Sequence, residues 1–357
     1  MKFYTSTTQY HCGIDLHSRQ MYVCVMDRAG TKLLHLNIKN NDFAFFLKKI
    51  APWRHDMTVC CECLFCWYWL ADACAEAGIE FVLAHALYLK SIHGGKNKND
   101  RIDSEKLAHL LRSNLIPPAY VYPAEKRPVR ALLRQRASYV WQRVELLQRI
   151  TTTQLAGNQV PVSKFSNNRQ KWLEALLDST EDPRQRFAFE QDVKLVTGYD
   201  EAIKALEKEL LNITKRESPR DFGILRTAPG VGKTLGLTIL YEVESIERFP
   251  SVQNFLSYAR LVKGTVASAG KIKGLRGAKL GNPYLRWALG EAAVLGKRHH
   301  EDLDTFSRQL EKKHGKFKGN AILASKMGRA IYFMLKNGTA FDVEKLTGKP
   351  SGSMIVT

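Results

Sequence analysis

The spacing of apolar residues changes near Pro123, and this change divides the chain into parts that fold differently. Between Tyr10 and about Leu83, short apolar runs of strand character are separated by helix-like stretches. After Pro123 the apolar residues step by three and four, as on one face of a helix. The sequence predicts an α/β domain over residues 1–122, a helical linker over 123–216, a third domain over 217–345 and a tail over 346–357.

The first part contains five strand candidates and two helix candidates. Three strands are expected between residues 11 and 39, with a turn at 27–30, and the runs "MTVCCE" and "IEFVLA" predict two buried strands. Helices are expected at 41–50 and 67–77, and "AYVYP" at 119–123 suggests one more short strand. Hairpin strands followed by strands that alternate with helices predict a mixed sheet with flanking helices.

The second part shows two apolar seams of the kind found in coiled coils. The first contains Leu133, Ala137, Val140, Val144 and Leu147, and the second contains Val196, Tyr199, Ile203, Leu206, Leu210 and Ile213. Two long helices with such seams form either an antiparallel hairpin within one chain or an arm for dimerisation, and the pattern alone leaves both open.

The third part, from about Pro219, reads as short helices broken by glycines, which predicts a mostly α domain. Its segment "TAPGVGKTLG" imitates a phosphate-binding loop, but Thr227 stands where that motif requires its first glycine. A Pro-Gly-Val-Gly turn that offers backbone N–H groups to a nucleic-acid phosphate is therefore favoured over ATP binding.

Charge and cysteine usage limit the classes of function. The chain has 54 Lys and Arg against 35 Asp and Glu, a net charge of +19, and nucleic acid is the usual partner of such an excess. No apolar run is long enough to span a bilayer and no leader opens the chain, so a cytoplasmic protein without a membrane partner is expected.

All seven cysteines lie between Cys12 and Cys74, an odd and clustered set that makes a poor disulfide framework. The run "CCECLFC" contains C-x-x-C spacing, but no second ligand pair follows it. Buried core cysteines are therefore favoured over a zinc site.

Four acids have the setting of a metal site. Asp15 interrupts one strand and Glu62 ends another, where open α/β sheets place their sites. Asp100 and Asp103 share one face of a helix start, where acids are also common for purely structural reasons. Carboxylates from separate segments can hold two Mg²⁺ ions that clamp the oxygens of a phosphodiester.

Basic residues are expected to hold the phosphate backbone. Lys96, Lys98 and Arg101 lie beside the helical acids, although such a charge run is more often a solvated surface. The glycine-rich stretch from Ala259 to Gly290 contains no acidic residue. It contains seven basic residues: Arg260, Lys263, Lys271, Lys273, Arg276, Lys279 and Arg286. Ser268 lies within it, and residue chemistry alone favours a capping or phosphate-contacting hydroxyl over a nucleophile.

The order of these features resembles the DEDD transposases of the insertion-sequence one-hundred-and-ten family, relatives of the pilin-gene invertases. The resemblance runs from the first strand to about Leu335, and it includes Ser268 in the basic glycine-rich stretch that ends in "GNPYLRWAL". It implies a RuvC-like domain with a ribonuclease-H-like fold, followed by a C-terminal transposase domain. It also implies that the four acids bind magnesium, that Ser268 is a covalent nucleophile on DNA, and that a structured RNA guides the enzyme. Many relatives have Thr-Gly after the glutamate, where this chain reads "ECLFCWYWL".

The resulting hypothesis is a transposase that cuts and rejoins DNA strands. A serine so distant from the acids in the sequence could come from another protomer, so a homo-oligomer, either a dimer or a tetramer, is expected. Two alternatives remain: a metal-dependent junction-resolving endonuclease that uses water as the nucleophile, and a non-catalytic nucleic-acid-binding protein.

Overall fold

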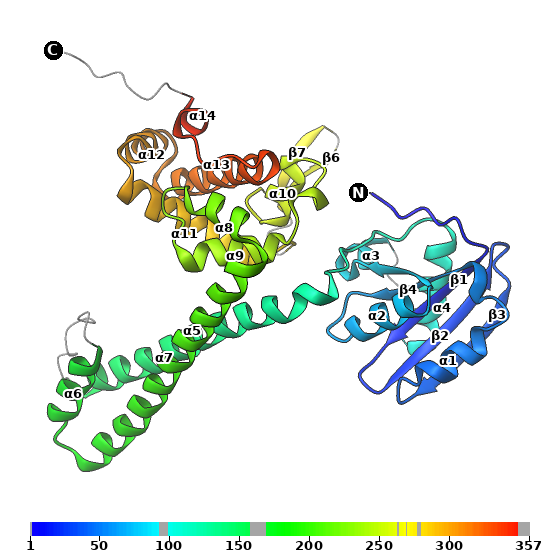
Figure 1. Cartoon of the computed structure of the whole chain (residues 1–357), viewed down its shortest axis with the longest axis horizontal. Coiled ribbons are helices and arrows are strands. Elements are labelled where there is room, and N and C mark those ends of the chain that lie inside the picture. The colour runs from blue at the N-terminus through cyan, green and yellow to red at the C-terminus, as the bar shows by residue number, and fades with distance from the viewer. Residues whose placement is uncertain are drawn as a thin grey trace. The chain divides into compact units, whose positions relative to one another are not determined.

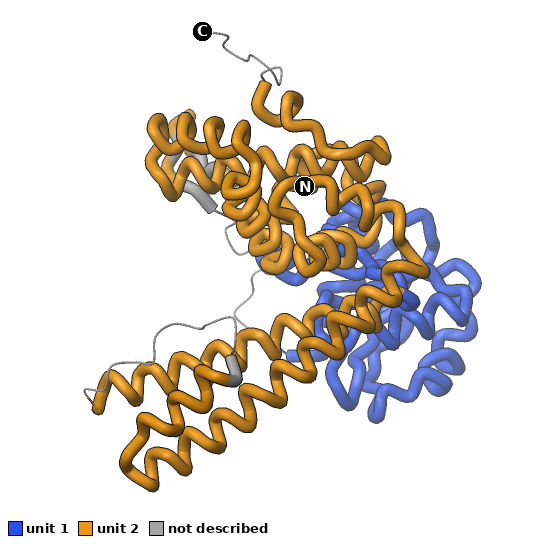
Figure 2. The backbone as a smooth tube through the Cα atoms, turned by 60° about the vertical axis from the view of Figure 1, so that its left-hand side comes forward, with its two compact units in different colours: residues 1–125 blue, residues 126–357 orange. Residues whose placement is uncertain are grey.

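The computed structural model describes residues 2–92, 99–157, 169–262, 264–268, 270–276 and 280–348. The chain separates into two compact units, residues 1–125 and 126–357 (Figure 2). None of the described helices is both long enough and apolar enough to cross a membrane.

The first unit is a five-stranded mixed sheet with helices. Its elements are β1 (Tyr10–Leu16), β2 (Gln20–Asp27), β3 (Lys32–Lys39), α1 (Phe43–Ile50), η1 (Arg54–Asp56), β4 (Met57–Glu62), α2 (Tyr68–Glu76), β5 (Glu80–Ala84), α3 (Ala86–Ile92) and α4 (Asp100–Arg112). The strand order is β3-β2-β1-β4-β5. The three N-terminal strands pair antiparallel, whereas β4 is parallel to β1 and β5 is parallel to β4.

Helices cover both faces of this sheet (Figure 1), as the alternation of side chains along β1 requires. Cys12, Ile14 and Leu16 of β1 share one apolar cluster with side chains of α1 and α2. Cys60 of β4 lies on the opposite face and packs with Leu107 of α4 and its neighbours. A mixed sheet with flanking helices is thereby confirmed. Residues 119–123 form no strand, and only an isolated bridge between Ala84 and Pro118 extends the sheet at that edge.

Gly13 allows α4 to lie directly on β1. A Cβ atom at this position would stand 2.3 Å from the carbonyl oxygen of Ser104 and 2.4 Å from the backbone nitrogen of Ala108. Both are backbone atoms of α4, so only glycine permits this approach. The helix begins after Asn99, whose Oδ1 accepts a hydrogen bond of 2.8 Å from the backbone N–H of Ile102. The start of α4 is therefore fixed above β1.

The second unit is mostly helical, as the sequence predicts. Its helices are α5 (Arg127–Ala156), α6 (Arg169–Asp178), α7 (Pro183–Glu217), α8 (Pro219–Arg226), α9 (Lys233–Val243), α10 (Val252–Tyr258), α11 (Pro283–His299), α12 (Glu301–His314), α13 (Lys316–Asn337) and α14 (Val343–Thr347). Short 3₁₀ turns form η2 (Ala124–Lys126), just before α5, and η3 (Ile246–Arg248). The strands β6 (Gly264–Ser268) and β7 (Lys271–Arg276) form an antiparallel hairpin where the sequence suggested only short helices.

The two longest helices, α5 and α7, lie side by side (Figure 1). Three ion pairs join them: Arg136–Glu207 at 2.6 Å, Arg143–Asp200 at 2.5 Å, and Arg149–Asp192. The partner numbers fall along α7 as they rise along α5, so the helices run antiparallel. Leu147 and Val196 of the expected seams are buried at this pairing. The two helices thus pair within one chain, and a supercoiled seam that serves assembly stays a prediction.

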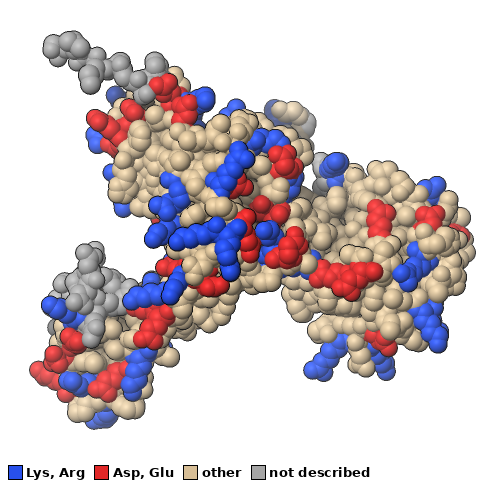
Figure 3. Space-filling model, in the orientation of Figure 1, with Lys and Arg blue, Asp and Glu red and all other residues tan. Residues whose placement is uncertain are grey.

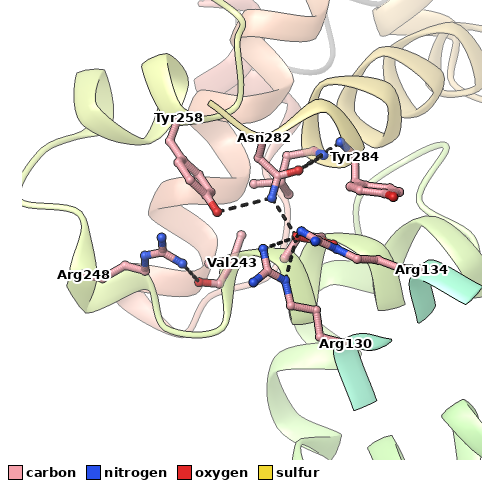
Figure 4. Close-up of polar contacts among 9 residues, drawn as sticks. Arg130, Arg134, Val243, Arg248, Tyr258, Asn282 and Tyr284 are labelled. Carbon is pink, nitrogen blue, oxygen red and sulfur yellow. Dashed lines mark hydrogen bonds and ion pairs between the residues drawn. The ribbon is translucent and has the colours of Figure 1, made fainter. Parts of the chain in front are cut away.

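A fully buried carboxylate, that of Glu242 in α9, joins three helices of the second unit. Arg130 and Arg134 of α5 donate four hydrogen bonds to it at 2.7–3.0 Å, and Nδ2 of Asn282 donates another at 2.7 Å. Figure 4 shows these three side chains converging. Oδ1 of Asn282 caps α11 by accepting from the backbone N–H of Tyr284 at 2.9 Å. Burial alone would raise the pKa of Glu242, but Arg134 and Arg130 outweigh it and hold the pKa below its ordinary value.

Removing this carboxylate should destabilise the second unit strongly. We expect Glu242→Ala to lower its free energy of unfolding by about 3–5 kcal/mol, because it leaves two partly buried guanidinium groups without their partner. Glu207→Ala, which breaks a more exposed ion pair, should cost less than about 1 kcal/mol. Urea unfolding, monitored by hydrogen exchange of peptides from α9 and α11, measures the cost of each substitution.

The same cluster should make stability depend on pH. Because the pKa of Glu242 is depressed in the folded state, its contribution is present above the unfolded pKa, about 4.3, and is lost as pH falls through the folded pKa. In Glu242→Ala the loss of stability at low pH should therefore be smaller than in the wild type. Equal costs for Glu242→Ala and Glu207→Ala would contradict a central role for the buried cluster.

Gly13→Ala should loosen α4 from the sheet. The added methyl group meets backbone atoms that cannot rotate away, so we expect a loss of about 1–3 kcal/mol and faster hydrogen exchange along α4. Gly198→Ala in α7 is a matched control: a Cβ there meets nothing within 4 Å, so it should leave α7 unchanged or up to about 1 kcal/mol more stable. Unchanged exchange in α4 of Gly13→Ala would show that the close approach is not needed.

Candidate active site

Two carboxylates end neighbouring parallel strands at the same edge of the sheet. Ile14 of β1 pairs with Cys61 of β4, so the next position along each strand brings Asp15 beside Glu62. Residues that are adjacent in parallel register point to the same face of the sheet. That face is the one on which Gly13, two residues before Asp15, meets α4. Asp15 and Glu62 therefore face the helix that carries the other two acids.

Asp100 and Asp103 occupy the first turn of α4. The Nε2 atom of His17 lies 3.3 Å from Oδ2 of Asp15 and 3.4 Å from Oδ1 of Asp100, so it stands between a strand acid and a helix acid. Gln20 donates a hydrogen bond of 3.3 Å to the other oxygen of Asp100. Asp103 forms an ion pair of 3.2 Å with Lys106, one turn further along α4. Asp15 and Asp100 are thus brought together directly.

The electrostatics of Asp15 also place the helical acids close by. Its side chain is only 14% exposed, and this burial raises its pKa. His17 opposes the rise, whereas the charges of Asp100 and Asp103 add to it. On the neighbouring strand, burial and then the charge of Glu62 raise the pKa of the Cys60 thiol. A bound cation would relieve this crowding of negative charge.

Asp15, His17 and Asp100 each offer a ligand atom within 4.8 Å of the others, the one such group found among the described residues. Carboxylate oxygens suit Mg²⁺ and Mn²⁺, so the donor set fits a divalent metal. His17 was missed in the sequence, although its position two residues after Asp15 was a usable signal. Among the described residues the cysteines form no such group of metal ligands. Five of the seven are buried, as expected.

The predicted phosphate-binding residues near this site are only partly described. Arg101 is exposed on the first turn of α4, between the two acids in sequence. Its backbone carbonyl accepts a hydrogen bond of 3.0 Å from Nε2 of His35, which ties the helix start to β3. Lys96 and Lys98 lie outside the described residues.

Ser268 lies at the tip of the β6–β7 hairpin. It is the last residue of β6, it pairs with Lys271, and it is exposed. Gly270 turns the chain with φ +75°, a conformation that favours glycine. Lys271 and Lys273 are exposed on β7, and this part of the hairpin carries no acid. An exposed serine residue paired with an exposed lysine is accessible to a phosphate backbone.

The other basic residues of this stretch are placed unevenly. Arg286 is exposed on α11, and Arg260 instead donates a hydrogen bond of 2.9 Å to the carbonyl oxygen of Gly281 at the base of the hairpin. Lys263, Lys279 and the side chain of Arg276 lie outside the described residues. Lys and Arg side chains also gather over α8, α9 and α11, with acidic side chains among them (Figure 3).

The Pro-Gly-Val-Gly turn before α9 has a packing role. Gly230 has φ +82°, and a Cβ atom there would lie 2.3 Å from the carbonyl oxygen of Ala292 and 2.4 Å from the backbone nitrogen of Gly296. The turn therefore lies against the backbone of α11, which explains this glycine without a phosphate. Gly232 is exposed at the start of α9, so contact with a phosphate at that helix start stays a prediction.

Comparison with known families agrees with this arrangement. The DEDD transposase model of IS110 elements, described as a transposase, matches residues 12–156, a range that includes all four acids. The model described as the transposase IS116/IS110/IS902 family matches residues 223–308, which include Ser268. No curated protein matches the chain significantly. Together the two matches cover more than half of the sequence, and the chain belongs to the IS110-type DEDD transposases, enzymes that move DNA.

Proposed function

We propose that this transposase cuts and rejoins DNA strands with two groups of residues, a carboxylate site that holds Mg²⁺ and the Ser268 hydroxyl. The observation that carries the proposal is the meeting of acids from β1 and α4 around His17, with Glu62 next to Asp15 in the sheet register. The raised pKa of Asp15 supports it, because burial and the nearby charges of Asp100 and Asp103 destabilise the ionised carboxylate, and a bound cation would stabilise it.

Asp15, Glu62, Asp100 and Asp103 would hold the metal, and two ions per site are expected. Bound divalent ions supply positive charge that stabilises the oxygens of a phosphodiester during cleavage. Asp15 and Glu62 offer their carboxylates from rigid strand ends, and Gly13 keeps the acids of α4 above them. Exposed Arg101, on the first turn of α4, would neutralise a backbone phosphate of the DNA.

Ser268 would be the nucleophile. Its Oγ forms the new bond to phosphorus, the bond from phosphorus to the leaving sugar oxygen breaks, and the serine proton passes to a base as the leaving oxygen gains one. A hydroxyl of another strand then displaces the serine, so the energy of the phosphodiester bond is kept. The exposed position of Ser268, paired with Lys271 in the hairpin register, supports this role.

A structured guide RNA and assembly into a dimer or tetramer complete the proposal. The guide RNA follows from the family resemblance, whereas assembly follows from the long sequence distance between Ser268 and the acids. The net charge of +19 suits two polyanions, and the paired helices α5 and α7 offer a long surface for assembly. An active site completed by two protomers would allow the serine to act on DNA held by another copy.

Ser268→Ala should abolish the covalent protein–DNA adduct and strand exchange while DNA binding is retained. Loss of a single hydrogen bond costs about 1–3 kcal/mol and would leave measurable activity, whereas loss of a nucleophile leaves none. Ser257→Ala, at another exposed serine of the same unit, should form the adduct normally. The assay traps the reaction on a nicked substrate and maps the adduct by denaturing gel and peptide mass.

Asp15→Asn, assayed in parallel with Ser268→Ala, distinguishes the transposase from the two alternative functions. Cleavage that survives Ser268→Ala but not Asp15→Asn would favour a junction-resolving endonuclease with water as nucleophile. Binding without cleavage by the wild-type protein would favour a non-catalytic role.

A further inference from the structure

Helix α13 carries a concentration of positive charge that the proposed reaction does not use. Its 22 residues contain five Lys and Arg and no Asp or Glu. Elsewhere in this unit the arginines are commonly paired with acids, as Arg130 and Arg134 are with Glu242. On α13 Lys336 pairs with Glu247, but no carboxylate among the described residues pairs with Lys326 or Arg329. Charge of this kind on a helix surface is available to an anionic partner.

Two adjoining cavities lie along this helix and share Lys326 and Arg329. The first, about 370 Å³, also has Phe333, Asn337, Thr339 and Asp342 in its lining. The second, about 290 Å³, is lined further by Lys318, Ser325 and the apolar side chains of Leu256 and Leu261. The first lies at the lower end of the range for small-molecule sites, about 300–1,000 Å³. We call these two adjoining cavities, which basic and apolar side chains line together, the groove.

The first cavity combines the groups that hold an unpaired nucleotide. The guanidinium carbon of Arg329 lies over the ring of Phe333, 5.1 Å from its centre, and Phe333 is 39% exposed. The guanidinium plane and the exposed part of the ring are both groups on which a nucleobase can stack. Asn337 and Thr339 supply exposed polar groups at the rim. Asp342 adds little free negative charge because Lys345 pairs with it at 3.1 Å.

We propose that this groove, defined by Lys318, Lys326, Arg329 and Phe333, binds a single-stranded segment of nucleic acid. One unpaired base stacks on Phe333 in the larger cavity. Its flanking phosphates contact Arg329 and Lys326 and then Lys318 along the smaller one. Duplex has its bases stacked on one another and cannot use the aromatic ring, so the groove selects unpaired nucleotides. RNA and DNA single strands share this chemistry.

The test measures binding of short single strands that carry 2-aminopurine, in both RNA and DNA forms, and of a duplex of the same sequence. Phe333→Leu keeps an apolar side chain of similar size but removes the stacking ring. It should weaken single-strand binding about tenfold and abolish the quenching of 2-aminopurine, with duplex binding unchanged. Arg329→Gln, at an exposed position that does not threaten folding, should weaken single-strand binding and lower its salt slope by about 0.7.

Lys312→Gln and Lys313→Gln, on the exposed face of α12 outside both cavities, are controls that remove the same charge and should change single-strand binding little. RNA bound more tightly than DNA, or the reverse, identifies which strand the groove serves. Single-strand binding that is equal in wild type, Phe333→Leu and Arg329→Gln would overturn the proposal. So would displacement of the strand by an acidic peptide at equal charge concentration, since that would indicate a protein partner. Ser268→Ala should bind as wild type, so failure here does not bear on the nucleophile.

Discussion

The close contact between Gly13 and the backbone of α4 is the constraint on which the arrangement of the acids depends. β1 and β4 end at one edge of the sheet, which by itself brings only Asp15 and Glu62 together. The other two carboxylates belong to a helix nearly 40 residues further along the chain, and no hydrogen-bonded ladder ties it to that edge. A strand residue without a side chain lets the helix backbone come within van der Waals contact. Its first turn then lies over the end of β1, where Asp100 shares His17 with Asp15.

The two units treat buried negative charge in opposite ways. Glu242 receives hydrogen bonds from two arginines and an asparagine, and the arginines hold its pKa low. Such a carboxylate is electrostatically satisfied and serves to join helices. Asp15 is also largely buried, but its nearest charged neighbours include two further acids, and its pKa is raised. Among the residues that the structure describes, His17 is the group that opposes this rise, which favours a cation site over a structural ion pair.

Much of this arrangement could be predicted from the sequence, because strands and amphipathic helices leave periodic patterns. The mixed sheet, the two long helices and the position of Asp15 and Glu62 at strand ends follow from such patterns. The β6–β7 hairpin did not, because its glycine and lysine content hides the strand alternation. His17 was not identified from the sequence, because its place in the site depends on α4, which the local sequence does not reveal. The close packing of Gly230 against α11 did not follow either, because it depends on a segment 60 residues away.

The central claim is that acids from β1, β4 and α4 form one metal centre, and anomalous diffraction from crystals soaked in Mn²⁺ tests it most directly. The claim predicts manganese peaks within about 2.2 Å of carboxylate oxygens from Asp15 and from at least one acid of α4, with Glu62 facing the same ions. Manganese bound elsewhere on the protein while this position stays empty, or a Glu62 side chain turned to the α1–α2 face of the sheet, would contradict it.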